Sequence, residues 1–181
     1  VDVTAGYEAV KRIKPMVEST YIPGVMGTLG GFDEIIVATG AVPRKMVIPG
    51  FEKCLTFTQL LREKYPVGDK VLFFGGGQSA CEAAYEMIKQ GKHPMIVEFA
   101  KDLVPAQNVC LSNASFLRDA MEYHKVPVYL EHTIREIKDK TAVIASKDGK
   151  NVFEIEYDNI VNGIGFVPAP VGGKAKNVHR C

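Results

Sequence analysis

The chain has 181 residues and a net charge of +1, with 46% hydrophobic and 24% charged residues. These values are typical of one large globular domain, or of one domain with part of another. The near-zero charge argues against nucleic acid or anionic lipid as a partner, and no apolar run approaches the roughly 18 residues that cross a membrane. The four cysteines contain no C-x-x-C pair, which argues against a dithiol redox centre or a zinc site. We expect a cytoplasmic protein.

The first 31 residues give the weakest pattern, and we assign them no role. The stretch from Tyr7 to Val17 fits a helix that Pro15 interrupts, and four glycines between positions 24 and 31 mark a loop. A strand is predicted from Phe32 to a turn at Gly40. The prolines at positions 43 and 49 then favour an extended segment.

A short helix is predicted next, because Thr56 can cap its N-terminus. Its inner face should carry three apolar residues, Phe57, Leu60 and Leu61.

The most informative motif follows Lys70. Residues 71–74 read as a buried strand, Gly75, Gly77 and Ala80 fit the pattern G-x-G-x-x-G/A, and residues 79–90 read as a helix. In this pattern the first glycine allows a tight turn, the second lets a pyrophosphate approach the backbone, and the third small residue lets the helix pack on the strand. The helix N-terminus attracts the negative charge. The candidate dinucleotide-binding residues of this motif are Gly75, Gly76, Gly77, Gln78, Ser79 and Ala80.

The elements after the motif support this interpretation. The helix carries an apolar face made of Ala80, Cys81, Ala84, Met87 and Ile88, and Gly91 is placed as its C-terminal cap. A second strand, residues 94–98, ends at Glu98, 23 positions after Gly75. An acid at about this spacing accepts hydrogen bonds from the adenosine ribose, and it repels a 2′-phosphate, so the sequence favours NADH over NADPH. Lys101 could soften that repulsion.

The rest of the chain predicts more strands than helices. A helix over about 113–123 should bury Phe116, Leu117, Ala120 and Met121, and a third parallel strand is predicted over 127–130. Short antiparallel strands follow at 133–138, 141–147 and 152–157, with a turn at Asp148-Gly149 between the last two. A final strand, 159–162, leads into Gly163, Gly165 and Pro168. We expect an α/β fold: a Rossmann-like parallel sheet with helices and an antiparallel β-meander.

Two further segments carry a family resemblance. Residues 38–44, Ala-Thr-Gly-Ala-Val-Pro-Arg, resemble the A-T-G-x-x-P segment of the two-dinucleotide-binding flavoproteins, in which an NAD(P)H domain is inserted into an FAD domain. Residues 161–168 resemble the strand that returns to the FAD domain. The sequence GGGQSACEAA, followed by a strand ending in Val-Glu, is similar to the corresponding motif of the 2-enoate reductase and 2,4-dienoyl-CoA reductase branch. Members of this branch add an FMN barrel and an iron–sulfur cluster.

The resemblance implies three pieces: a remnant of the FAD domain and linker (1–48), an NAD(P)H domain (49–165) and a return segment (166–181). The FAD domain's own G-x-G-x-x-G and its later Gly-Asp motif are absent. We therefore expect an excised piece that binds NADH, holds no FAD, FMN or iron–sulfur cluster by itself, and is inactive alone. Its partners would be the dinucleotide and the rest of the parent flavoprotein.

The resemblance also implies roles for particular residues. Glu82 would lie near the nicotinamide, although an acid at a helix start is also ordinary, and Gly163 and Gly165 would line the dinucleotide groove or form a plain turn. A hydride would pass from NADH to FAD and then to FMN, for reduction of an activated C=C bond, so no catalytic residue or metal ligand is expected here. The four histidines share no spacing. Two alternatives stay open: another disulfide or oxygen reductase of the same superfamily, and a non-catalytic nucleotide-binding domain.

Overall fold

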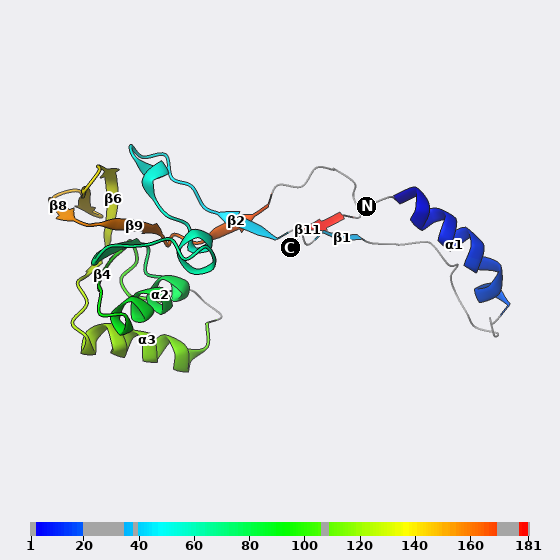
Figure 1. Ribbon diagram of the computed structural model, residues 1–181, viewed down its shortest axis with the longest axis horizontal. Helices are drawn as coiled ribbons and strands as arrows, with labels where there is room; N and C mark the ends of the chain where they lie inside the picture. Colours follow the sequence, from blue (N-terminus) through cyan, green and yellow to red (C-terminus); the bar gives the residue numbers. More distant parts are fainter. Residues whose placement is uncertain (1–2, 20–34, 38–39, 106–108, 170–177, 181) are drawn as a thin grey trace. The chain divides into compact units, whose positions relative to one another are not determined.

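The computed structural model describes residues 3–19, 35–37, 40–105, 109–169 and 178–180. The chain forms two units, one of residues Ala41–Val167 and one that combines Val1–Gly40 with Pro168–Cys181. Figure 1 labels the helices and strands of both units. No described helix has the length and apolar character that a bilayer-spanning helix requires.

The smaller unit contains one helix and one pair of strands among its described residues. Helix α1 spans Val3–Glu18, and strand β1 (Ile35–Val37) pairs in parallel with β11 (Val178–Arg180). Pro15 lies inside α1, so the expectation that it interrupts the helix is wrong. A proline removes only its own N–H, and the last turn still closes through the Ser19 N–H, which donates to the Pro15 carbonyl at 3.1 Å. The predicted glycine loop lies outside the described residues.

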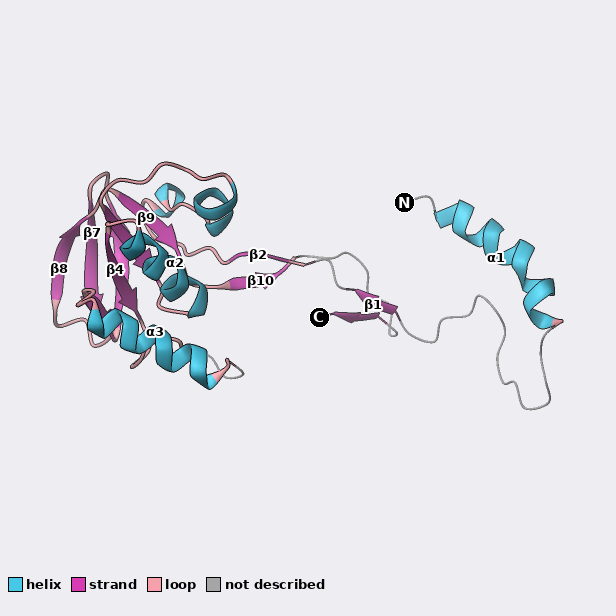
Figure 2. Ribbon diagram, turned by 60° about the horizontal axis from the view of Figure 1, so that its bottom comes forward, coloured by secondary structure: helices cyan, strands magenta, loops and turns pink. Residues whose placement is uncertain are grey.

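The larger unit is built on a four-stranded parallel sheet in the order β5-β4-β3-β9. Its strands are β3 (Lys70–Phe74), β4 (His93–Glu98), β5 (Val128–Leu130) and β9 (Asn159–Asn162), of which β4 and β9 are labelled in Figure 2. The sheet confirms the predicted α/β fold. Because the strands are parallel, their carboxyl ends meet at one edge, where ligands bind in open α/β sheets.

The two faces of the sheet are covered by different layers. Successive strand residues point to opposite faces, so Val71 and Phe73 pack in the cluster with α2 and α3, whereas Leu72 and Phe74 pack with the antiparallel strands. All four side chains are buried. A strand that buries both faces reads as a continuous apolar run, which is the pattern that residues 71–74 show.

Helices α2 (Gln78–Lys89) and α3 (Leu111–Tyr123) lie side by side in front of the sheet in Figure 2. Helix α2 ends as predicted: Gly91 has φ +75°, its N–H donates to the Ile88 carbonyl at 2.9 Å, and the Lys92 N–H donates to the Met87 carbonyl at 3.0 Å. In α3 the predicted burial of Phe116 is wrong, because its side chain is 53% exposed. The ring packs edge-on against Tyr85 at the rim of the helix layer, and Ala114 occupies the buried position instead.

The other face of the sheet carries the predicted meander. It consists of β6 (His132–Ile137), β7 (Thr141–Ser146) and β8 (Val152–Glu156), paired antiparallel in that order. The predicted turn between β7 and β8 is present, with Gly149 at φ +74° and its N–H donating to the Ser146 carbonyl at 2.8 Å.

The segment before β3 is less regular. It contains β2 (Ala41–Pro43), which pairs with β10 (Phe166–Pro168), the 3₁₀ turn η1 (Phe51–Lys53) and the π-helical turn η2 (Thr58–Arg62). Thr56 caps as predicted: its Oγ1 accepts from the Gln59 N–H at 3.2 Å, and the Gln59 Oε1 accepts from the Thr56 N–H at 2.9 Å. Leu60 is buried, but Leu61 is 54% exposed, against expectation.

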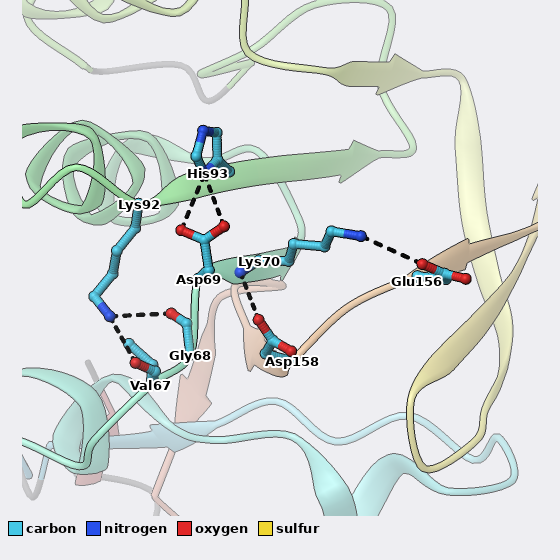
Figure 3. Close-up of polar contacts among 8 residues, drawn as sticks. All are labelled: Val67, Gly68, Asp69, Lys70, Lys92, His93, Glu156 and Asp158. Atoms are coloured by element: carbon cyan, nitrogen blue, oxygen red, sulfur yellow. Dashed lines mark hydrogen bonds and ion pairs between the residues drawn. The ribbon is translucent and has the colours of Figure 1, made fainter.

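Polar contacts fasten the amino-terminal edge of the sheet, opposite the carboxyl ends (Figure 3). The Lys92 ammonium donates to the carbonyls of Val67 and Gly68, at 2.6 and 3.0 Å. The Gly68 N–H donates to Asn159 Oδ1 at 2.7 Å, and the Lys70 N–H donates to Asp158 Oδ2 at 2.8 Å. These bonds tie the chain entering β3 to the starts of β4 and β9.

Replacing Lys92 with Met should therefore destabilise the protein. The variant leaves two half-buried carbonyls without their charged donor, and we expect the free energy of unfolding to fall by about 1.5 kcal/mol. Urea unfolding followed by circular dichroism measures this change. Lys89→Met is the matched control, because Lys89 pairs with Glu86 on the exposed side of α2. Equal midpoints for the two variants would contradict the role of Lys92.

Candidate functional site

Three chain segments meet at the carboxyl edge of the parallel sheet and line one pocket. Gly75 and Gly77 follow β3, Glu98 and Phe99 stand at the end of β4, and Gly163 and Gly165 follow β9. Five of the ten residues selected from the sequence line this pocket, namely Gly75, Gly77, Glu98, Gly163 and Gly165, whereas Gly76, Gln78, Ser79, Ala80 and Glu82 do not. Arg44, Met46 and Thr133 also line the pocket, and the sequence pattern did not select them. Arg44 directly follows Pro43, the last residue of the A-T-G-x-x-P pattern, and this position in the sequence could have pointed to it.

The turns after β3 and β9 pack backbone against backbone. Gly75 has φ +108°, and a Cβ added to it would lie 2.4 Å from the Gly163 carbonyl oxygen. A Cβ on Gly163 would lie 3.0 Å from the carbonyl oxygens of both Phe74 and Gly75. The strands can end this close together only because neither position carries a side chain.

Gly76 and Gly77 differ in their surroundings. A Cβ on Gly76 would lie 2.6 Å from Leu103 Cδ2 and 3.1 Å from Glu98 Cβ, so this glycine is enclosed by protein. A Cβ on Gly77 would meet nothing within 4 Å, and its φ of −69° is available to any residue. The fold alone therefore does not require glycine at position 77, and Gly77 faces the open pocket.

Helix α2 begins at Gln78 with free donor capacity at its N-terminus. Gly77 is the N-cap residue, no side chain caps the helix, and the first turn holds no acid. The first N–H groups of a helix have no intrahelical acceptor, so this end favours an anion. Ser79 is exposed and does not act as the cap, whereas Ala80 is buried against the sheet. Glu82 is exposed, and its Oε1 accepts from Gln78 Nε2 at 2.8 Å.

Glu98 holds the glycine turn as well as facing the pocket. Its Oε2 accepts from the Gly76 N–H at 2.5 Å, and its Oε1 accepts from the Ala100 N–H at 2.7 Å. These two bonds were not predicted from the sequence, because they depend on the folding of the turn over the end of β4. A carboxylate has about four acceptor positions, so each oxygen keeps one for a further donor.

The return segment is fixed by Asn162, a buried polar side chain with 6% of its surface exposed. Its Nδ2 donates to the Arg44 carbonyl at 2.8 Å, and its Oδ1 accepts from the Ile164 N–H at 3.3 Å. The Arg44 N–H in turn donates to the Gly165 carbonyl at 2.9 Å. Gly165 has φ +91°, and a Cβ on it would meet nothing within 4 Å. Asn162 thereby sets the path of the chain along one wall of the pocket.

The cysteine nearest the pocket is not a reactive thiol. Cys81 lies below the glycine turn, where its Sγ donates to the Gly76 carbonyl at 3.4 Å. Burial, followed by the negative charges of Glu98 and Glu82, raises the pKa of Cys81 to about 12. It stays a thiol at neutral pH and acts as a small core residue, as expected. Within the described residues no group of three histidine, cysteine or acidic side chains could hold a metal.

The chain is similar to a known protein family, to two relatives and to a solved structure. The family model described as pyridine nucleotide-disulphide oxidoreductase matches residues 9–180. Cinnamate reductase of Clostridium sporogenes is 32% identical over 138 residues, which cover 76% of this chain and 20% of that protein. A component of the alkyl hydroperoxide reductase of Escherichia coli is 30% identical over 170 residues, covering 90% of this chain and 30% of that protein. A solved structure of 2-naphthoyl-CoA reductase with 2-naphthoyl-CoA aligns with a TM-score of 0.66 and 28% identity, over 82% of this chain and 23% of that one.

These matches confirm the superfamily that residues 38–44, 70–98 and 161–168 indicated. The chain spans between a fifth and a third of the length of these relatives.

A short stretch gives a match of another kind. Over 32 residues, 18% of the chain, it is 69% identical to phosphoribosylformylglycinamidine cyclo-ligase of Bacillus pumilus, of which it covers 9%.

Proposed function

The chain belongs to the pyridine nucleotide-disulphide oxidoreductase family, and from this membership we propose that its unit Ala41–Val167 binds NADH as part of a larger flavin-dependent oxidoreductase. The observation that carries the proposal is the pairing of an uncapped helix N-terminus with the open space at Gly77. A pyrophosphate needs both features, because it requires N–H donors and close approach to the backbone.

The residues around the pocket fit a dinucleotide along its length. The N–H groups at Gln78 and Ser79 would hold the pyrophosphate, with Gly75, Gly76 and Ala80 shaping the turn and seating the helix. Glu98 would accept hydroxyl hydrogens from the adenosine ribose with the acceptor positions that Gly76 and Ala100 leave free. Glu82 would lie toward the nicotinamide. Gly163 and Gly165 would form the wall of the pocket across from the glycine turn after β3.

Bound NADH would supply a hydride to a flavin. The residues of this chain bind and orient the nucleotide, and no described side chain near the pocket is proposed as an acid or base. We place FAD, FMN and an iron–sulfur cluster in the rest of the parent protein, and we do not expect this chain to turn over by itself.

For the reaction of the parent protein we propose reduction of an activated C=C bond. The support is the similarity to cinnamate reductase, because cinnamate is an α,β-unsaturated carboxylate. The similarity to a component of alkyl hydroperoxide reductase favours a second candidate, electron transfer toward a peroxide- or disulfide-reducing partner. Both candidates require NADH binding, whereas a domain with a purely structural role does not.

The cyclo-ligase match bears on the N-terminal residues. We propose that the 32-residue stretch is residues 1–32, ahead of the flavoprotein sequence, so that the expected FAD-domain remnant begins near residue 33. The length fits, and none of the flavoprotein motifs found in the sequence lies before position 38. The family model begins at residue 9, so residues 9–32 are where the two similarities would overlap. The proposed bounds of the NAD(P)H domain (49–165) and the return segment (166–181) are unaffected.

Gly77→Val tests the binding site without disturbing the fold. Its side chain would enter the space needed by the pyrophosphate, so the Kd for NADH should rise more than about tenfold, equivalent to roughly 1.4 kcal/mol. The free energy of unfolding should hardly change, since a Cβ there meets nothing within 4 Å. Calorimetric titration and urea unfolding measure the two quantities. Unchanged NADH affinity in a folded variant would place the nucleotide elsewhere.

Glu98→Gln tests nucleotide selection. The unmodified protein should prefer NADH to NADPH by about tenfold, because a charge-assisted hydrogen bond is worth about 1.5–3 kcal/mol and the carboxylate repels a 2′-phosphate. Glutamine removes the repulsion but leaves one oxygen for the two N–H groups of Gly76 and Ala100, so both affinities should fall while the ratio of the two Kd values drops below about threefold. Glu82→Gln is the matched control, because this acid lies on the far side of the pyrophosphate in our assignment and should affect both nucleotides alike. A wild-type preference for NADPH would refute the assignment of Glu98.

Deleting residues 1–32 tests the proposed origin of the N-terminal stretch. All the hydrogen bonds described at the pocket join residues of the Ala41–Val167 unit, so the Kd for NADH should stay within about twofold of the full chain. Side-by-side titration of the two proteins decides this. A loss of binding in a truncated protein that still unfolds cooperatively in urea would assign these residues to the flavoprotein unit.

A further inference from the structure

A lysine and a phenylalanine form a contact at the end of the pocket beyond Glu98. Phe99 lines the pocket directly after β4, and 54% of its side chain is exposed. The Lys147 ammonium lies 4.9 Å from the centre of the Phe99 ring. At this distance the cation is attracted to the π face of the ring, and it also places a positive charge next to the pocket.

The backbone fixes this contact. The Glu131 N–H donates to the Ala100 carbonyl at 3.0 Å, and the Lys147 N–H donates to the Glu131 carbonyl at 2.7 Å. These bonds join the loop after β4, the turn between β5 and β6, and the end of β7. Lys147 therefore starts from a defined position beside Phe99, although it is far from that residue in sequence.

The charge of Lys147 has no acidic partner among the described ion pairs. Lys150, on the same β7–β8 hairpin, pairs with Asp148 at 3.9 Å and has 87% of its side chain exposed. Lys147 instead rests on an aromatic ring at the pocket's rim. A cation held in this way can accept an anionic group of a ligand without first giving up a carboxylate.

We propose that Phe99 and Lys147 form the adenosine end of the site, with Phe99 as a stacking surface for the adenine and Lys147 as a determinant of nucleotide specificity. This rests on the proposed NADH site. The 2′-phosphate of NADPH would stand beside Glu98, in the neighbourhood of Phe99, and carries between one and two negative charges near neutral pH. Lys147 attracts this phosphate and Glu98 repels it, so the lysine limits the preference for NADH.

On this proposal Glu98 and Lys147 set the selectivity of the site together. Glu98 already accepts two backbone N–H bonds, which offset part of its negative charge toward the pocket. The attraction by Lys147 is partly screened, because its side chain is exposed, and its effect should be a few-fold rather than a hundredfold.

The test compares nucleotides with and without the 2′-phosphate. The probes are NADH with NADPH, and 5′-ADP with 2′,5′-ADP, titrated into the full 181-residue chain. Lys147→Met keeps the apolar stem and removes the charge. We expect it to weaken NADPH and 2′,5′-ADP by about threefold or more, to leave NADH and 5′-ADP within about twofold, and to lose its effect at high salt.

Two further variants make the result decisive. Lys150→Met is the matched control and should leave all four affinities unchanged. Phe99→Leu keeps an apolar residue but removes the aromatic face, so it should weaken all four ligands by about fivefold or more. Equal effects of Lys147→Met on both members of a pair, or no effect, would overturn the specificity role. Such an outcome for Lys147→Met refutes only the inference about Lys147, provided that the wild-type protein binds NADH and that Gly77→Val abolishes this binding. If the wild-type protein binds no probe at all, the proposed NADH site itself is refuted, and this inference with it.

Discussion

The close approach of the Gly75 and Gly163 turns is the constraint on which the site depends. A Cβ on Gly75 would overlap the Gly163 carbonyl, and a Cβ on Gly163 would press on the carbonyls of Phe74 and Gly75. With both side chains missing, β3 and β9 stay paired up to their last residues, through the Gly163 N–H to the Phe74 carbonyl at 2.8 Å. At these two glycines the pocket wall is thus made of backbone.

Around this point, polar groups position one another rather than acting alone. Glu98 holds the turn at Gly76, and the Val104 N–H donates to the Gly76 carbonyl at 2.7 Å from the other side. Asn162 fixes the return segment against Arg44. A group that serves both the fold and the ligand is pre-organised, so little order has to be gained when the nucleotide binds.

Much of this fold could be predicted from the sequence because its signals are local. The apolar run before Gly75, the C-terminal cap at Gly91 and the turn at Gly149 depend on neighbouring residues, and each lies where the pattern placed it. Phe116 and Leu61 were assigned wrongly, since helical spacing does not show where the covering layer ends. The bonds of Glu98 and the contact between Phe99 and Lys147 could not be predicted, because they join segments that only the tertiary fold brings together.

The pairing of β3 with β9 also has a consequence for biosynthesis. Lys70 and Asp158 are 88 residues apart in sequence, so β9 can pair with β3 only after the meander has been made. A nascent chain on the ribosome would expose one edge of β3 for that whole interval, and pairing over such a separation is slow. Helix α2 and strand β4, which follow β3 directly, can cover its other edge and one face early. The order of the elements along the chain therefore protects the most apolar strand during synthesis, leaving a single open edge for its last neighbour.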